Sequence, residues 1–414
     1  MPEVGDRPPN GGGPNKEAVM LCSVTSFVLE GIEARSVRVD VDVHRGLPSF
    51  AIVGLPDSAV SESRERVRAA LVNSGFEFPL RRTVVNLSPA SLRKSGPGLD
   101  LAIAAALLGA SEQVSQDELA GTAFVGELGL DGSIRSVPGA LAFAEAARDD
   151  GVPIVVPAED VAQAALAAGA EIMPLAALIE LPAVLAGDSR SDLPAPLLLD
   201  RDSDQHAPDL ADLRGQREVR RALEIAAAGE HSLLLIGPPG AGCSMAASRL
   251  PSILPPLSRE EALEVARIAS ACGRFGSGVR GRPFRAPHHT ISSVGLLGGG
   301  NPARLGEVTL AHRGVLYLDH LEGFSRDALE ALRPTLKSGE ATISRLGMLG
   351  TFPACFLLVA GAIPCPCGRC PSYPRCMYSP GSVNDHRRGL IAVSGDFDLR
   401  VAISPPNAAE ISGP

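Results

Sequence analysis

The sequence predicts an α/β protein in which a domain with a parallel sheet and a phosphate-binding loop follows a smaller α+β domain. Three observations support this fold class. Valine alternates with polar residues at 36–43, which is typical of a half-buried strand. An apolar run at 232–236 leads into a glycine-rich loop and a helical pattern. From residue 209 onward, helical and strand patterns alternate, as they do in parallel sheets.

Length and composition limit the classes of protein that this chain represents. The chain has 414 residues, and its 38 Lys+Arg against 47 Asp+Glu give a net charge of −9. At about 150 residues per domain, two or three domains are expected. The acidic balance argues against a protein that coats nucleic acid non-specifically. The sequence shows neither a signal-peptide pattern nor an apolar run long enough to span a membrane. With eight cysteines, we expect a reduced, cytoplasmic setting and no membrane partner.

The N-terminal half predicts a flexible leader at 1–19 and one α+β domain at 20–186. The leader is rich in glycine and proline and has no apolar core. The spacing of apolar residues in the domain predicts strands at 36–43, 83–87 and 152–157, and helices at 58–74, 99–110 and 140–147. A polar stretch with several prolines at 187–208 is typical of a linker, so a second domain is predicted at 209–414.

The loop after the apolar run at 232–236 matches the spacing of a P-loop, in which backbone N–H groups cradle phosphate. The alternative is a glycine-rich turn that opens an ordinary helix, which the combination of strand, loop and helix disfavours. The predicted nucleotide-binding residues are Gly237, Pro238, Pro239, Gly240, Ala241, Gly242, Cys243 and Ser244. ATP with Mg²⁺ is the expected ligand. Cys243 occupies the place of the P-loop lysine, and a thiol carries no positive charge near neutral pH.

A second apolar strand pattern, at 314–318, ends in an acidic residue. Asp319 is predicted to bind Mg²⁺ together with Ser244, as the acid at this position does in phosphoryl-transfer ATPases. The next residue is His320, where a glutamate that polarises water often stands. A histidine can act as a base, but it does not supply a carboxylate's charge beside Mg²⁺. A plain core strand is the alternative interpretation.

Half of the cysteines fall within twelve positions near the end of the chain. Cys365, Cys367, Cys370 and Cys376 have a spacing that predicts a structural, tetrahedral Zn²⁺ site on a loop with proline and glycine turns. The alternative is a set of reduced or redox-active thiols without metal.

Two clusters of arginine are candidates for contact with nucleic-acid phosphates. The cluster at 64–68 alternates with glutamate, so it is interpreted as a salt-bridged helix face. Arg280, Arg282 and Arg285 are less diluted by acid and are the predicted DNA-binding residues. His288 and His289 follow them and are interpreted as loop residues, because adjacent side chains point in different directions on most backbones.

Several longer motifs resemble one known family. They are GLPSFAIVGLPD at 46–57, ESRERVR at 62–68, NSGFEFP at 73–79, RAPHHTIS at 285–292, GLLGGGN at 295–301 and LAHRGVLYLD at 310–319. Over roughly residues 20–404, the chain resembles the ComM/YifB branch of the magnesium-chelatase-like AAA+ ATPases. The resemblance implies an AAA+ domain preceded by a Lon-protease-like domain of the ribosomal S5 domain 2-like fold. It also implies a hexameric, helicase-like DNA motor, so the expected partners are DNA, further copies of the chain or an active paralogue.

At four positions the chain departs from the pattern of that family. The P-loop lysine falls on Cys243, the second acid on His320, the polar sensor on Ile363 and the trans-acting arginine on Asp396. The family's helical lid is expected to be missing, because the chain ends at 414. Since phosphoryl transfer depends on such charges, we predict an ATP-binding pseudoenzyme with little or no hydrolysis.

The same comparison removes the protease chemistry that the resemblance suggests for the N-terminal domain. Gly98 occupies the position of the Lon serine and Leu141 that of its paired lysine. Without a hydroxyl and an amine there is no Ser-Lys nucleophile, so a scaffold or binding platform is expected.

Other functions remain open from the sequence. One is an active DNA-dependent ATPase motor in which His320 and other cations substitute for the lost groups. Others are a non-enzymatic adaptor or assembly subunit for a paralogue, and a decayed gene product. Insertion of magnesium into a porphyrin ranks low, because no tetrapyrrole site is recognisable.

Overall fold

The computed structural model describes residues 20–187, 208–276, 278–279, 281–300, 304–345, 348–368, 376 and 378–405. The predicted leader, nearly all of the predicted linker, Arg280 and Cys370 lie outside these residues. The chain divides into two compact units. The described part of the first comprises 20–27, 36–135 and 175–187, and the second comprises 28–35, 136–174 and the described residues from 208 onward. This division groups 136–174 with the C-terminal half, whereas the sequence predicts one domain over 20–186. The domain boundaries stay predictions.

The strands of the first unit lie in the order β3-β4-β2-β1-β5. The predicted alternation at 36–43 is confirmed in β2, where Val37, Val39, Val41 and Val43 are buried while the intervening residues are more exposed. β4 pairs antiparallel with β2 and parallel with β3. The bounds of the strands that lie wholly or mostly in this unit are Met20–Glu30 (β1), Glu33–His44 (β2), Ser49–Val53 (β3), Arg82–Ser88 (β4), Ala123–Phe124 (β5), Glu127–Leu128 (β6) and Ile134–Arg135 (β7).

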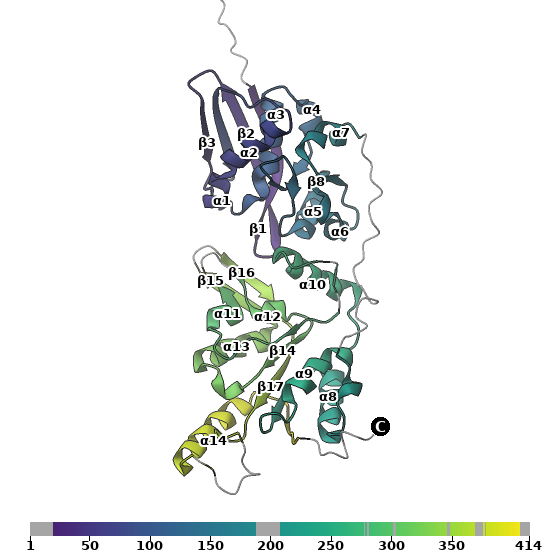
Figure 1. The fold of residues 1–414 in the computed structure, drawn as a ribbon, viewed down its shortest axis with the longest axis vertical. Coiled ribbons are helices and arrows are strands. Elements are labelled where there is room, and N and C mark those ends of the chain that lie inside the picture. The colour runs from purple at the N-terminus through teal and green to yellow at the C-terminus, as the bar shows by residue number, and fades with distance from the viewer. Residues whose placement is uncertain are drawn as a thin grey trace, which may run out of the picture. The chain divides into compact units, whose positions relative to one another are not determined.

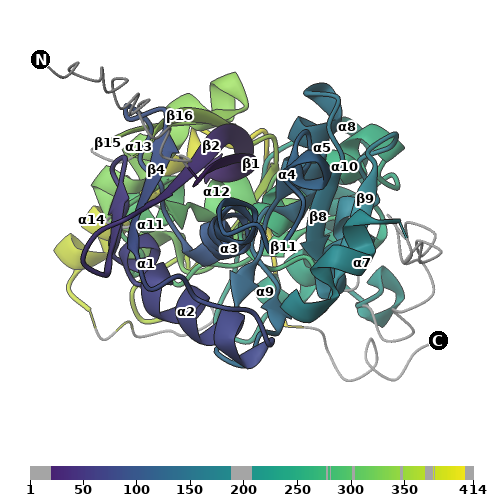
Figure 2. The ribbon, with the colours of Figure 1, turned by 90° about the horizontal axis from the view of Figure 1, so that it is seen from above.

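Helices α2 and α3 of the first unit lie side by side (Figure 2). Every residue of α3 is buried, as expected for a helix that is apolar all round. Its one acid, Asp100, accepts hydrogen bonds from Ser63 and, at 2.6 Å, from Arg66 Nε on α2, so the buried charge is paired. The helices of this unit are Ser58–Ser61 (α1), Ser63–Asn73 (α2), Asp100–Ala110 (α3), Gln116–Leu119 (α4) and Leu181–Leu185 (α7), with 3₁₀ turns at Pro97–Leu99 and Leu178–Glu180.

The second unit contains the predicted parallel sheet. Its order is β11-β14-β17-β10-β18, and each of its four pairings is parallel. The strands are Phe284–Arg285 (β11), Val315–Leu318 (β14), Leu357–Ala362 (β17), Leu233–Ile236 (β10) and Leu399–Ala402 (β18). The predicted strands at 232–236 and 314–318 are β10 and β14. All residues of β17 are buried, as is typical of a parallel strand that is covered on both faces.

Helices cover both faces of this sheet (Figure 1). Successive residues of its strands alternate between two hydrophobic cores. Leu235 packs with α8 (Arg217–Gly229) and α9 (Cys243–Arg249). Leu234 packs on the opposite face with α11 (Ser293–Leu297), α12 (Glu307–Leu310) and α13 (Arg326–Ser338). This alternation explains why the strands read as continuous apolar runs, since both sides are buried.

The remaining elements of the second unit complete the described chain. Leu141, the residue at the predicted lysine position of the Lon pattern, is fully buried in α5. No helix within the described ranges is both long enough and apolar enough to cross a membrane. The elements are α5 (Ala140–Asp149), β8 (Ile154–Pro157), α6 (Val161–Ala164), β9 (Ile172–Leu175), α10 (Arg259–Ala271), β12 (Gly298–Gly299), β13 (Arg304–Leu305), β15 (Glu340–Arg345), β16 (Met348–Pro353) and α14 (Pro380–Ser394), with 3₁₀ turns at Ala158–Asp160, Leu210–Asp212, Leu250–Ser252 and Leu321–Gly323.

Candidate nucleotide-binding site

The carboxyl ends of β10, β17 and β14 meet at one edge of the parallel sheet. Leu235 pairs with Gly361 and Ile236 with Ala362, and Gly237 N donates a 3.0 Å hydrogen bond to Ala362 O. Ligand sites of open parallel sheets lie at this edge. The loops after these strands line a cavity of about 250 Å³, formed by residues 237–245, 319–320 and 361–363. All eight predicted nucleotide-binding residues therefore lie together with Asp319, His320 and Ile363.

Glycines shape this cavity at two kinds of position. Gly240 and Gly242 have φ of 80° and 99°, in the left-handed region that side chains rarely adopt. Gly361 is needed for a different reason, because Tyr317 and Asp319 lie close to its backbone. A Cβ there would lie 2.5 Å from Tyr317 Oη and 3.3 Å from Asp319 Oδ1. The loop can turn, and the strands can converge, only because these positions carry no side chain.

The two predicted Mg²⁺ ligands are in contact. Ser244 Oγ donates a 3.0 Å hydrogen bond to Asp319 Oδ2, and Tyr317 Oη donates one of 3.0 Å to Asp319 Oδ1. Burial raises the pKa of the Tyr317 phenol well above its ordinary value, so this group stays a donor. A hydroxyl and a carboxylate are oxygen ligands of the kind that Mg²⁺ takes beside substrate phosphates, so the donor set fits the ion.

Cys243 opens α9 at the position where a P-loop lysine would stand. Burial, together with the charge of Asp319, raises the pKa of its thiol to about 11. The side chain also packs against the apolar core under α8 and α9. At neutral pH this position therefore supplies neither a positive nor a negative charge to a bound phosphate.

His320 lies at the mouth of the cavity and is followed by a carboxylate. Its side chain is half exposed, and its Nδ1 is 3.4 Å from Glu322 Oε1. The second oxygen of Glu322 is buried and has no hydrogen-bond partner among the described residues. The ring of His289 lies 6.2 Å from that of His320 and 4.2 Å from that of His288. The expectation that the two adjacent histidines diverge is wrong, because this loop turns their rings toward each other.

The other two positions that depart from the family pattern lie in different places. Ile363 lines the cavity and presents an aliphatic side chain to it, and its carbonyl accepts a 2.9 Å hydrogen bond from His386 Nε2. Asp396 lies away from the residues that line the cavity and accepts a 2.9 Å hydrogen bond from Arg333 Nε on α13. Its charge is thus paired within the chain.

Three residues near the site were not anticipated from the sequence. Gln216 Nε2 donates to Ala241 O at 2.7 Å and to Ser404 O at 3.0 Å, which ties the glycine-rich loop to a distant segment. Nothing local in the sequence indicates this contact. The contact of Tyr317 could have been predicted, because residues two apart along an extended chain point to the same side, and Asp319 comes two residues after Tyr317. Glu322 lies only three residues beyond Asp319, so the sequence does contain a second acid near the strand end. It was not considered because only the adjacent position, 320, was compared with the family pattern.

The described members of the predicted DNA-binding cluster are engaged within the chain. Arg285 forms a bidentate pair with Glu307, at 2.6 and 2.8 Å. Arg282 donates to Pro255 O and Arg313 O, at 2.6 and 2.7 Å. Phosphate would have to displace these acceptors. DNA binding through this cluster stays a prediction, and Arg280 lies outside the described residues.

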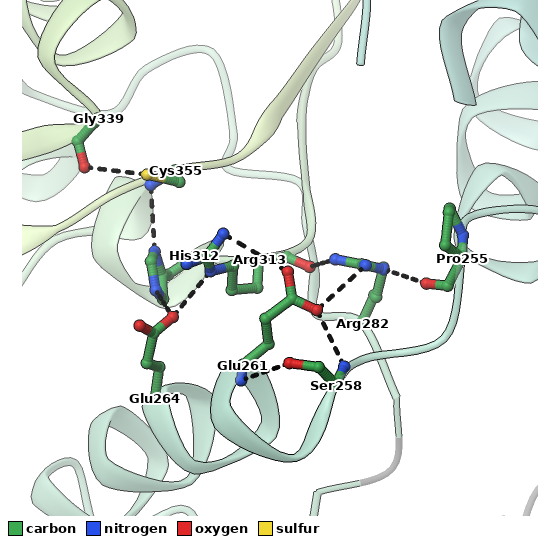
Figure 3. Close-up of polar contacts among 9 residues, drawn as sticks. All are labelled: Pro255, Ser258, Glu261, Glu264, Arg282, His312, Arg313, Gly339 and Cys355. Carbon is green, nitrogen blue, oxygen red and sulfur yellow. Dashed lines mark hydrogen bonds and ion pairs between the residues drawn. The ribbon is translucent and has the colours of Figure 1, made fainter. Parts of the chain in front are cut away.

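Arg282 belongs to a polar network that joins α10, the turn before β14 and the segment before β17 (Figure 3). His312 is only 2% exposed. Its Nε2 donates to Glu264 at 3.1 Å, and its Nδ1 accepts from Cys355 N at 3.1 Å. Arg313 Nε also reaches Glu264, at 2.8 Å. Burial lowers the pKa of His312, which suits a neutral ring with one donor and one acceptor nitrogen.

Three of the predicted zinc ligands gather just beyond the cavity. The Sγ atoms of Cys365, Cys367 and Cys376 all lie within 4.8 Å of one another. Among the described residues, this is the one group of three or more cysteine, histidine or acidic side chains with a metal-binding arrangement. Cys370 lies outside the described residues, and zinc binding stays a prediction.

The raised pKa of Cys243 predicts slow alkylation. A rise from 9.0 to about 11 is two pH units, so the reactive thiolate fraction near pH 8 falls about a hundredfold. In peptide-mapped labelling with N-ethylmaleimide, we expect Cys243 to react much more slowly than exposed Cys355. Its rate should rise about tenfold per pH unit between pH 7 and 9. Fast labelling of Cys243 that does not depend on pH would contradict this environment.

The network around His312 predicts that acid weakens the second unit. Because the folded-state pKa of His312 is lowered, the unfolded state takes up the proton first. The contribution to stability is complete above the unfolded pKa of about 6.5 and is lost as pH falls toward the folded value. Between pH 7.5 and 5.5, the thermal midpoint should fall more steeply in the unmodified protein than in His312→Gln. His44→Gln, at a more exposed histidine, is the matched control and should keep the unmodified slope. Equal slopes for the protein and His312→Gln would refute the assignment.

Two family models match the chain. The model described as magnesium chelatase, subunit ChlI, matches residues 209–411, and the model described as subunit ChlI of Mg-chelatase matches residues 39–160. YifB of Salmonella typhimurium is 42% identical over 385 residues, which cover 91% of this chain and 75% of that protein. An uncharacterised protein of Mycobacterium tuberculosis is 41% identical over 397 residues, which cover 94% of this chain and 78% of that protein.

A third relative is named as a competence protein. Competence protein ComM of Haemophilus influenzae is 39% identical over 353 residues, which cover 84% of this chain and 69% of that protein. The parallel sheet and its phosphate loop fit the AAA+ fold that such a relationship implies. The chain belongs to the ComM/YifB family of magnesium-chelatase-like proteins.

Proposed function

We propose that this chain is an ATP-binding AAA+ protein that takes up ATP with Mg²⁺ at the cavity between β10, β14 and β17 and hydrolyses it very slowly or not at all. One observation carries the proposal. The neutral Cys243 thiol stands at the lysine position, beside an intact Ser244–Asp319 pair.

Binding is supported by what the cavity keeps. The loop has the glycine conformations of a phosphate cradle, and Ser244 and Asp319 offer oxygen ligands to Mg²⁺. A lost charge-assisted hydrogen bond from lysine costs about 1.5–3 kcal/mol. Since about 1.4 kcal/mol is a factor of ten in affinity, binding is expected to be weakened rather than abolished. The described residues that line the cavity include no Lys or Arg, so the phosphate charge depends on Mg²⁺ and backbone N–H groups for compensation.

Slow hydrolysis is supported by what the cavity lacks. Phosphoryl transfer is catalysed almost entirely by positioning and electrostatic stabilisation. His320 replaces the carboxylate next to Asp319, and Ile363 presents no polar side-chain group to the cavity. Loss of a single preorganised donor costs about 10²–10³ in turnover. Several losses in one cavity therefore predict turnover near background.

One contact favours a second candidate, a working ATPase. Glu322 lies next to His320, and its buried oxygen lacks a partner among the described residues. A His320–Glu322 pair would then activate water in place of the missing acid. In that case the unmodified protein turns over ATP, and both His320→Ala and Glu322→Gln abolish the turnover.

The cofactor set and the domains complete the proposal. We assign ATP and Mg²⁺ to the cavity and a structural Zn²⁺ to the cysteine cluster. Residues 209–414 form the AAA+ core, and 20–186 form a Lon-like binding platform without protease chemistry. A cytoplasmic location stays a prediction, as does association with DNA, with further copies of the chain or with an active paralogue.

Binding and turnover of ATP, measured on the same preparations, test the proposal. The unmodified protein should bind a fluorescent ATP analogue more tightly with Mg²⁺ than without it, and should show no turnover above background with or without DNA. Cys243→Lys should tighten binding roughly tenfold or more, because it restores a charge-assisted hydrogen bond. Its turnover should stay at background, since His320 and Ile363 are unchanged.

Cys243→Ala is the matched control for the lysine variant. Alanine also carries no charge, so its ATP affinity should stay close to that of the unmodified protein. Turnover of the unmodified protein at a rate of about 1 s⁻¹ or more, an ordinary enzymatic rate, would overturn the proposal. So would the absence of ATP binding by both the unmodified protein and Cys243→Lys.

A further inference from the structure

We propose that a zinc ion bound by Cys365, Cys367 and Cys376 holds the turn at 365–368 against Pro239 of the phosphate loop, so that metal loading sets the nucleotide affinity of the cavity. This inference rests on the proposed function, because it assigns a regulator to the same cavity.

The turn that carries two of the thiols is well defined. Gly368 N donates a 2.8 Å hydrogen bond to Cys365 O, which closes the four-residue turn Cys-Pro-Cys-Gly. Proline in the second position and glycine in the fourth are typical of a type I turn. The turn brings the Sγ atoms of Cys365 and Cys367 to 3.4 Å from each other, and Cys376 Sγ lies 3.5 Å from Cys365 Sγ.

These separations suit a shared metal better than a disulfide. A disulfide needs about 2.05 Å between its sulfur atoms, whereas Zn–S bonds of about 2.3 Å in a tetrahedron place the sulfur atoms about 3.8 Å apart. Cys365 is fully buried and the other two are partly buried. Soft thiolates in a sheltered position are the ligands that zinc selects.

The same stretch of chain builds the cavity and the cluster. Residues 361–363 line the phosphate cavity, and Cys365 follows only two residues later. The chain leaving β17 therefore passes directly from the nucleotide site to the proposed metal site, with only Pro364 between Ile363 and Cys365.

A steric contact between Gly368 and Pro239 also links the cysteine-bearing turn to the phosphate loop. Gly368 has φ of 68°, and a Cβ added there would lie 2.9 Å from Pro239 Cγ and 3.0 Å from Pro239 Cδ. The backbone of the turn thus lies against the Pro239 ring, and Pro239 itself lines the cavity. Gly237 is held separately by Ala362 O. The phosphate loop is therefore supported by the end of β17 and by the cysteine-bearing turn.

Metal binding would act on the phosphate loop by ordering the turn at 365–368, which packs against it. Thiolate ligation adds a cross-link to the turn that the hydrogen bond between Gly368 N and Cys365 O closes, and metal-binding free energy is spent on folding such segments. When the metal is removed, the turn loses its cross-link and Pro239 loses its support. The phosphate cradle then becomes less preorganised, and ordering it costs part of the binding energy of the nucleotide.

The first test measures metal and nucleotide on the same full-length samples. Elemental analysis should find about one zinc per chain, and Cys367→Ser should lower it. After zinc is stripped with a chelator, the chelator removed and Mg²⁺ restored, the Kd for the ATP analogue should rise about tenfold, and added Zn²⁺ should reverse the change. Absence of zinc, or an unchanged Kd in fully stripped protein, would overturn the inference.

The second test breaks the contact and leaves the thiols in place. Gly368→Ala should retain zinc but weaken ATP binding, since its Cβ would collide with the Pro239 ring. Pro239→Ala removes the two contacting atoms, so the double variant should recover affinity relative to Gly368→Ala. Gly276→Ala is the matched control: its φ is also positive, at 54°, but an added Cβ would have no atom of the described residues within 4 Å apart from its chain neighbours. This control should bind ATP with the affinity of the unmodified protein. If the effects of Gly368→Ala and Pro239→Ala on ATP affinity simply add in the double variant, the proposed contact is refuted.

A readout without nucleotide separates failure of this inference from failure of the proposed function. Cys243 comes directly after the phosphate loop in the sequence, so loosening of the loop should expose its thiol. Its alkylation rate, measured by peptide mapping, should therefore rise when zinc is stripped and fall when Zn²⁺ is restored. If ATP does not bind but this rate responds to zinc, the proposed function fails and the link between metal and loop stands. If ATP binds but neither Kd nor alkylation of Cys243 responds to zinc, the link fails and the proposed function stands.

Discussion

The convergence of β10, β17 and β14 at their carboxyl ends is the constraint on which the candidate site depends. Parallel pairing places Gly237, Asp319 and Gly361 at one edge of the sheet, although they are far apart in sequence. The approach is close enough that Gly361 has no room for a side chain. Because both faces of these strands are buried in close-packed cores, a shift of register would disrupt the packing on both sides of the sheet. The geometry of the cavity is therefore supported by the whole core of the second unit.

The electrostatics of the cavity follow from that geometry and distinguish it from an ordinary P-loop site. Asp319 and Glu322 lie close enough to Cys243 to add to the effect of burial on its pKa. A thiol in that environment stays neutral, so the loss of the lysine is not compensated at its own position. In the proposed function, a bound Mg²⁺ ion would therefore be the main positive charge available to phosphate, because the described lining residues include no Lys or Arg. These features are the basis of the proposal that the cavity holds a nucleotide but does not stabilise the transition state of its hydrolysis.

Particular residues show how far the sequence carried the prediction. The strand 232–236, the acid at 319 and the paired role of Ser244 were predictable, because each depends on a local pattern or on motif spacing. The contact of Gln216 with Ala241, and the close rings of His288 and His289, were not, since they depend on how loops fold over one another. Arg282 and Arg285 looked like free cations in the sequence. Only the fold showed that their partners are Glu307 and main-chain carbonyls.

The sequence by itself determined the α/β class with a parallel sheet, the glycine-rich loop after its strand and the family, because periodicity, glycine spacing and long motifs are properties of the chain. Tertiary structure alone decided the state of Cys243, the pairing of Asp396 with Arg333 and the position of the cysteine-bearing turn against Pro239. The physical reason is the same in each case. Burial, charge proximity and steric contact arise between residues that only packing brings together, and no local pattern records them.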